Sequence, residues 1–98
     1  MFVVTVKFIV NMTFQAQFME AAQKQARNSL LLEPECHYFD VCKSQENHNE
    51  VFLYEIYETA KAFDEHLMTS HFKSFDQKTS NWIESKKVET YELARSLK

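Results

Sequence analysis

The chain opens with alternating side chains, a pattern typical of a β-strand with one buried face. Residues 2–10 are mostly β-branched or aromatic, which favours an extended backbone. We expect the wholly apolar face of this strand to lie in the core and the mixed face to lie outside it. The two faces are Phe2, Val4, Val6, Phe8 and Val10 against Val3, Thr5, Lys7 and Ile9.

A helix is predicted over residues 14–32, where apolar side chains recur at helical spacing. Thr13 stands directly before this stretch and is a preferred N-cap residue. Pro34 follows shortly after it, and proline cannot continue a helix. The pattern therefore predicts a helix that is capped by Thr13 and ends before Pro34.

Two more alternating stretches, residues 36–43 and 50–58, predict strands joined by the polar loop 44–49. In the first strand we expect Phe39 to point toward the helices and Cys36 to point away from them. In the second strand, period two predicts one set toward the helices and the other set away. These are Phe52, Tyr54 and Ile56 against Val51, Leu53, Glu55 and Tyr57.

The rest of the chain predicts a helical region in two pieces and a last strand over residues 88–94. Thr59 caps the first piece, and the break falls at Met68-Thr69-Ser70 because Ser and Thr compete for backbone N–H groups. The order β-α-β-β-α-β is typical of a ferredoxin-like α+β sandwich. We expect an antiparallel sheet in the order 4-1-3-2, with both helices on one face, in a single domain of residues 1–98.

The sheet face without helices would then be too apolar to lie in water, which predicts that it packs against a second copy of the chain. Lys7 and Glu55 are expected on this face as well, paired across neighbouring strands inside the homodimer interface. The apolar members expected there are Val3, Thr5, Ile9, Tyr38, Cys42, Leu53 and Tyr57.

Composition narrows the classes of function. The net charge is −3 and no basic stripe is present, which argues against nucleic acid and an anionic membrane surface as partners. The chain has no glycine, and phosphate loops and dinucleotide sites need glycine for close backbone approach. Cys36 and Cys42 would lie roughly 20 Å apart on a strand, too far for a disulfide. Two half-buried thiols indicate a cytoplasmic protein.

His66 and His71 flank the predicted helix break, so both could point into a pocket between helices and sheet. A neutral histidine can take up or release a proton near pH 7, which suits a general base. Spacing alone leaves open that both are capping or surface histidines. No Cys–His cluster has the spacing of a zinc site, and no metal is expected.

Short motifs along nearly the whole chain resemble those of a known protein family. They are Asn28-Ser29, Glu33-Pro34 with Cys36, Phe39-Asp40-Val41, Phe52-Leu53-Tyr54-Glu55-Ile56-Tyr57, Ala62-Phe63, His66 and Thr69-Ser70-His71-Phe72. With these motifs the chain resembles the antibiotic biosynthesis monooxygenase family, whose members are dimeric α+β barrels. Two branches resemble it most: quinol monooxygenases that use no cofactor, and an isomerase that processes phosphorylated autoinducer-2.

The resemblance implies a cofactor-free monooxygenase acting on a small quinol- or anthrone-like substrate. His66 or His71 would be the base, while Tyr54 and Asn28 would hold the substrate oxygens. Two alternatives remain open, an isomerase of a small dicarbonyl compound and a dimer that binds a small apolar ligand without catalysis. Aromatic side chains at helical spacing are expected in the core or as walls of the pocket: Phe72, Phe75 and Trp82.

Overall fold

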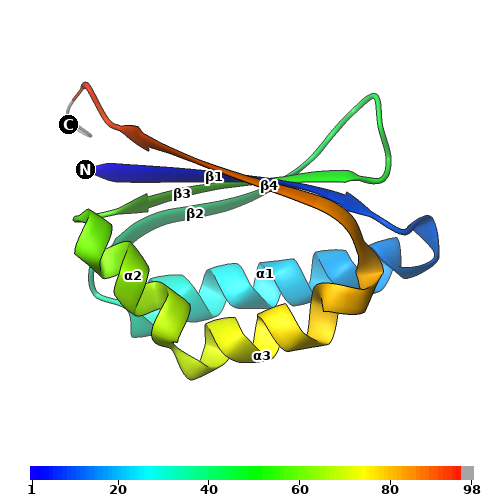
Figure 1. The fold of residues 1–98 in the computed structure, drawn as a ribbon, viewed down its shortest axis with the longest axis horizontal. Helices are drawn as coiled ribbons and strands as arrows, with labels where there is room; N and C mark the ends of the chain where they lie inside the picture. The colour runs from blue at the N-terminus through cyan, green and yellow to red at the C-terminus, as the bar shows by residue number, and fades with distance from the viewer. Residues whose placement is uncertain (96–98) are drawn as a thin grey trace.

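Four strands form one sheet, and the helices lie on one side of it in the computed structural model, which describes residues 1–95 (Figure 1). None of the helices in this range is both long and apolar enough to cross a membrane. In chain order the elements are β1 (Phe2–Val10), a 3₁₀ turn (Met12–Phe14), α1 (Gln15–Leu32), β2 (Cys36–Lys43), β3 (Glu50–Tyr57), α2 (Ala60–Met68), α3 (Ser70–Thr79), a second 3₁₀ turn (Ser80–Trp82) and β4 (Ile83–Glu92).

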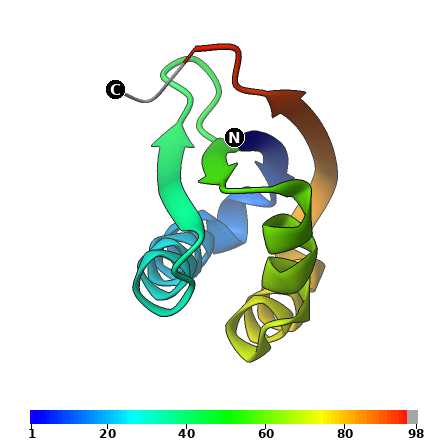
Figure 2. The ribbon, with the colours of Figure 1, turned by 90° about the vertical axis from the view of Figure 1, so that its left-hand side faces the viewer.

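The sheet order is β2-β3-β1-β4 and every pairing is antiparallel, which confirms the predicted topology and the ferredoxin-like fold. Figure 2 shows the sheet curving over the helices, with α1 on the side of β2 and α2 and α3 on the side of β4. The core lies between the sheet and the helices. Its central members from β1 and α1 are Val4, Val6, Phe8, Val10, Phe18, Ala22 and Ala26.

The predicted orientation of β3 is wrong. Residues directly opposite each other in an antiparallel pair share a sheet face, and Val4 pairs with Glu55 while Val6 pairs with Leu53. The helix side of β3 therefore carries Val51, Leu53, Glu55 and Tyr57, and the open side carries Phe52, Tyr54 and Ile56. Both sides of this strand are rich in apolar residues, so alternation alone could not decide between them.

This register also excludes the predicted ion pair between Lys7 and Glu55. Lys7 pairs with Phe52 on one side and with Lys87 on the other. Glu55 lies on the opposite face of the sheet, buried among the core side chains.

The predicted direction of Cys36 is wrong as well. The pairing of β2 with β3 shifts register between Cys36 and Tyr38, and this irregularity turns Cys36 into the core beside Phe39. Cys42 is exposed, and both thiols are free, as predicted. Burial raises the pKa of Cys36 to about 12, with the nearby carboxylates of Glu33 and Glu55 adding to the rise.

The helix boundaries agree with the sequence in some places and differ in others. Thr59 caps α2 as predicted, its hydroxyl accepting from the Ala62 N–H at 3.1 Å. Thr13 caps nothing, because a 3₁₀ turn precedes α1 and the Asn11 side chain accepts from the Thr13 N–H. The last strand begins at Ile83 rather than at Val88.

Candidate active site

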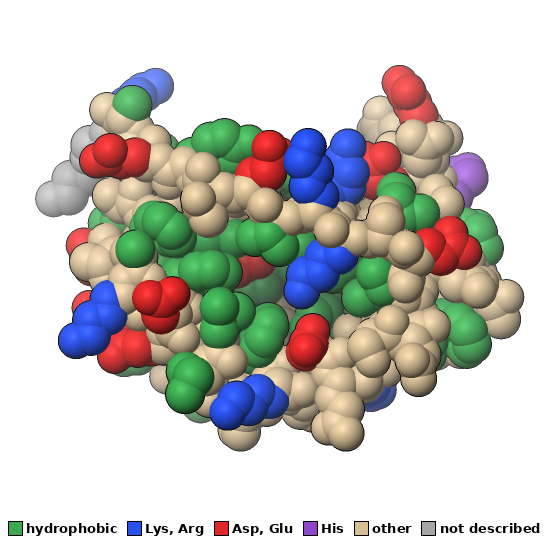
Figure 3. All heavy atoms as spheres, viewed as in Figure 1, with side chains coloured by type: hydrophobic (Ala, Val, Ile, Leu, Met, Phe, Trp, Pro, Cys, Tyr) green, Lys and Arg blue, Asp and Glu red, His purple; other side chains and the backbone are tan. Residues whose placement is uncertain are grey.

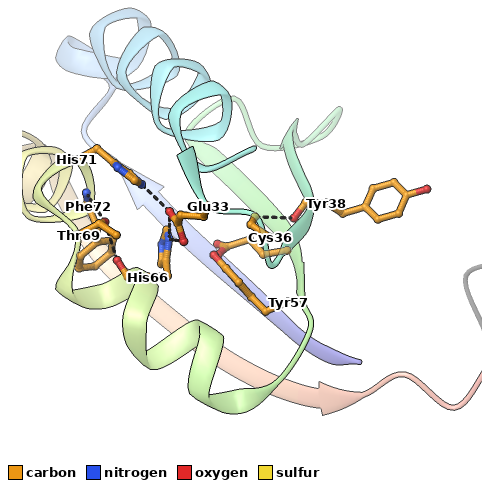
Figure 4. A network of polar contacts seen from close by, with 9 residues as sticks. Glu33, Cys36, Tyr38, Tyr57, His66, Thr69, His71 and Phe72 are labelled. Carbon is orange, nitrogen blue, oxygen red and sulfur yellow. Dashed lines mark hydrogen bonds and ion pairs between the residues drawn. The ribbon is translucent and has the colours of Figure 1, made fainter. Parts of the chain in front are cut away.

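Three titratable side chains meet where the C-terminal end of α1 lies beside the junction between α2 and α3. Glu33 directly follows α1, His66 is in the last turn of α2, and His71 is in the first turn of α3. The His66 Nδ1 atom lies 2.9 and 3.1 Å from the two carboxylate oxygens of Glu33, and the His71 Nε2 atom lies 2.5 Å from one of them. Figure 4 shows both rings pointing toward this carboxylate.

The break between α2 and α3 brings the two histidines to the same carboxylate. Thr69 has an extended backbone (φ −69°, ψ 151°), which stops α2 and redirects the chain into α3. Its hydroxyl donates to the His66 carbonyl at 2.7 Å and accepts from the Phe72 N–H at 3.2 Å, so one side chain caps both helices. The predicted break is confirmed, and its role is to aim His66 and His71 at Glu33.

The charge balance of the cluster favours an ionised Glu33. Burial alone would raise the pKa of this carboxyl, but hydrogen bonds and charge interactions with His66 and His71 outweigh burial and lower the pKa below its ordinary value. The cluster could also hold a divalent metal ion, since its three ligand atoms lie within 4.8 Å of one another. In this structure one nitrogen of each imidazole, His66 Nδ1 and His71 Nε2, makes a hydrogen bond to the carboxylate.

Next to this cluster a hollow lies between the sheet and the helices. Figure 3 shows it between β4 and the helices α2 and α3, bordered by hydrophobic side chains with an acidic group deep inside. Its volume is about 50 Å³. Besides the polar or charged residues Gln25, Glu55, His66 and Lys86, it is lined by Val6, Phe8, Phe39, Leu53, Phe63, Leu67, Phe72, Phe75 and Val88.

Glu55 is the acidic group of this cavity and only 3% of its surface is exposed. One carboxylate oxygen accepts a hydrogen bond from the Tyr57 hydroxyl at 2.6 Å. Burial raises the pKa of Glu55 to about 7, against the opposing effects of the Tyr57 hydrogen bond and the His66 charge. Burial, followed by the charge of Glu55, also raises the pKa of Tyr57, which stays a neutral donor. A carboxyl of this kind can accept or release a proton near neutral pH.

The structure brings together only some of the residues predicted for the site. His66, Phe72 and Phe75 line the cavity. His71 and Asn28 lie in a neighbouring groove between α1 and α3, outside the cavity.

Two predicted residues lie elsewhere. The expectation that Tyr54 faces the helices is wrong, because β3 presents it on the open side of the sheet. Trp82 stacks on Phe14, with ring centroids 5.7 Å apart, and packs at the edge of the core. Neither side chain lines the cavity.

Sequence reasoning missed Glu33, Glu55 and Gln25 as site residues. Glu55 did carry a signal, because a charged side chain is unusual in a strand whose neighbouring residues, Phe52 to Tyr57, are otherwise apolar or aromatic. Glu33 and Gln25 carried none by themselves, since each becomes distinctive only when the helices pack.

Comparisons with a protein-family model and with solved structures identify proteins that are similar to this chain. The family model for antibiotic biosynthesis monooxygenase matches residues 1–78. A candidate antibiotic biosynthesis monooxygenase from Nitrosomonas europaea is 27% identical, with a TM-score of 0.92 over 97% of this chain and 100% of the other. A candidate monooxygenase from Lactobacillus acidophilus is 26% identical (TM-score 0.87), and the match covers 91% of this chain but 42% of that protein. Rv0793 from Mycobacterium tuberculosis, at 16% identity and a TM-score of 0.89, shares the fold. No curated protein matches the chain.

Proposed function

Because this chain belongs to the antibiotic biosynthesis monooxygenase family, we propose that it oxidises a small quinol- or anthrone-like aromatic compound with dioxygen and without a cofactor. The observation that carries the proposal is that His66 belongs both to the cavity lining and to the cluster with Glu33. Its ring lines an apolar cavity and its Nδ1 atom is held by Glu33. A buried base that lines an apolar cavity is what deprotonation of such a substrate requires.

His66 would act as the general base. With Nδ1–H donated to the Glu33 carboxylate, the neutral ring keeps Nε2 as its proton acceptor, and the carboxylate stabilises the imidazolium that forms. The deprotonated substrate is electron-rich enough to reduce dioxygen itself. For an anthrone, a ring CH₂ and O₂ give a ring C=O and water, so one oxygen atom enters the product and the other leaves as water.

Oxygen consumption tests this proposal. A panel of anthrones and hydroquinones would be offered to the wild type, to His66→Ala and to His48→Ala, a matched control in the exposed β2–β3 loop. We expect turnover with at least one compound, a loss of about 10²-fold or more in His66→Ala, and no change in His48→Ala. If no compound is turned over, the oxygenase proposal fails. An assay with dicarbonyl sugar phosphates would then test the isomerase alternative.

We also propose that the protein is a homodimer formed through the open side of the sheet. Three side chains of β3, Phe52, Tyr54 and Ile56, replace the pair Leu53 and Tyr57 that the sequence predicted there. Neighbouring strands add Tyr38 and Tyr91, which are 46% and 50% exposed. The same face carries Lys7, Asp40, Lys87 and Glu89, and its apolar, aromatic part is stabilised by packing against a second sheet.

Light scattering combined with size-exclusion chromatography tests the dimer. Tyr54→Lys places a charge on the open face and is expected to give a monomer, whereas Gln17→Lys on the exposed side of α1 is expected to stay dimeric. A wild type that elutes as a monomer at micromolar concentration would contradict the proposal.

A further inference from the structure

We propose that Gln25 and Glu55 bind the two oxygen atoms of one ligand in the cavity. The ligand class is an aromatic compound that carries a carbonyl oxygen, which accepts from the Gln25 amide, and a hydroxyl group, which donates to Glu55. This inference rests on the proposed function in one respect, that the cavity is where the substrate binds.

The Gln25 amide is a buried donor without a partner. Only 3% of the residue is exposed, and its Nε2 atom makes no hydrogen bond within residues 1–95. Gln25 lines the cavity, where most of the surrounding side chains are apolar. A buried N–H group without an acceptor is unfavourable, and the unfavourable free energy is recovered when an acceptor oxygen arrives. A carbonyl or phenolate oxygen of a ligand supplies that acceptor.

Glu55 complements Gln25 because it offers an acceptor where Gln25 offers a donor. Its Oε1 atom is occupied by the Tyr57 hydroxyl, while Oε2 makes no hydrogen bond within the described part of the chain. The two polar groups come from opposite walls, Gln25 from α1 and Glu55 from β3, with His66 as a further member of the same lining. A ring with one acceptor and one donor satisfies both walls, whereas a hydrocarbon leaves both unsatisfied.

The cavity has to widen to admit such a ring. Its volume is about 50 Å³, and a cavity that holds benzene measures about 150 Å³. The way in lies beside β4, where Figure 3 shows the hollow at the surface. Leu67 and Val88 stand at this edge and are 36% and 47% exposed, so both can move without opening the core. Ligand binding is therefore expected to displace the side chains of Leu67 and Val88.

Binding without oxygen tests the inference separately from catalysis. Three probes would be titrated anaerobically and followed by NMR: 4-hydroxyacetophenone, acetophenone without the hydroxyl, and 4-ethylphenol without the carbonyl. We expect the wild type to bind the first probe about tenfold more tightly than either of the others. Gln25→Leu should weaken the two carbonyl probes about tenfold and leave 4-ethylphenol unchanged, while the control Gln23→Leu on the exposed side of α1 changes nothing.

A second measurement, the stability of the unliganded variant, separates lost binding from a folding defect. The substitution should weaken binding but should not weaken folding. Gln25→Leu removes an unpaired buried donor, so the unliganded variant should unfold at the same or a higher urea concentration than the wild type. Equal affinity of the variant and wild type for all three probes would overturn the inference, as would no binding by any probe or a destabilised unliganded variant. If the probes bind as expected but no compound consumes oxygen, the proposed function fails and this inference stands.

Discussion

Glu55→Gln should make the protein more stable at neutral pH and leave it nearly unchanged in acid. Folding raises the pKa of this carboxyl from 4.5 to about 7 because the group is buried. The folded state therefore binds the proton more tightly than the unfolded state does, so wild-type stability falls as the pH rises from 4.5 to 7. At 1.36 kcal/mol per pH unit, the stability lost over this interval is about 3 kcal/mol. The glutamine variant carries no such charge and can still accept the Tyr57 hydrogen bond.

Urea denaturation at pH 4.5 and at pH 8, at one fixed protein concentration, measures the effect. The difference between variant and wild type isolates Glu55, because the other titrating groups are shared by both proteins. We expect the variant to be more stable by up to about 3 kcal/mol at pH 8 and equal to the wild type at pH 4.5. Glu20→Gln, on the exposed side of α1, controls for the loss of one negative charge. A variant that follows the wild type in parallel at both pH values would refute the reasoning, since Glu55 would then titrate alike in both states.

Three further predictions concern the supports of the site. Glu33→Gln should destabilise the protein by about 1–3 kcal/mol at pH 7. The difference from the wild type should disappear as the pH falls below 4.5 through the lowered pKa of Glu33. Urea denaturation over this pH range measures the difference, and a difference that stays constant would contradict the reasoning. Thr69→Ala removes two caps and should lower the free energy of unfolding by about 1–2 kcal/mol, and an unchanged denaturation midpoint would contradict this. At pH 8 iodoacetamide should leave Cys36 unlabelled in the folded protein and label it in urea, as followed by mass spectrometry; a folded protein labelled at Cys36 would contradict this.

Local patterns sufficed for most of the architecture. Period-two alternation over residues 2–10 identified β1 and its core face, because this strand has one wholly apolar side. Thr59 and Thr69 gave the boundaries of α2, since a hydroxyl that caps a helix acts within a few residues of its own position. With the strand and helix order known, few topologies remain for a sheet of this size, and the predicted one is observed.

The direction of each β3 side chain was decided by tertiary structure. The alternation of this strand is ambiguous because both of its sides are rich in apolar residues, and a one-residue difference in pairing exchanges Tyr54 with Glu55. The irregularity at Cys36 had a similar effect on β2. Such choices depend on hydrogen bonds between strands far apart in the chain, which no local window contains.

In the candidate active site, too, some features follow from the sequence and others only from tertiary packing. The sequence by itself determined that His66 and His71 flank a helix break, and this holds in the structure. Only packing revealed that both rings meet Glu33, a residue more than 30 positions away from either of them. It also turned Glu55 inward, where the loss of water raises its pKa, and left the Gln25 donor without a partner. Burial and long-range proximity are properties of the packed chain, so the chemistry that depends on them appears only in the folded protein.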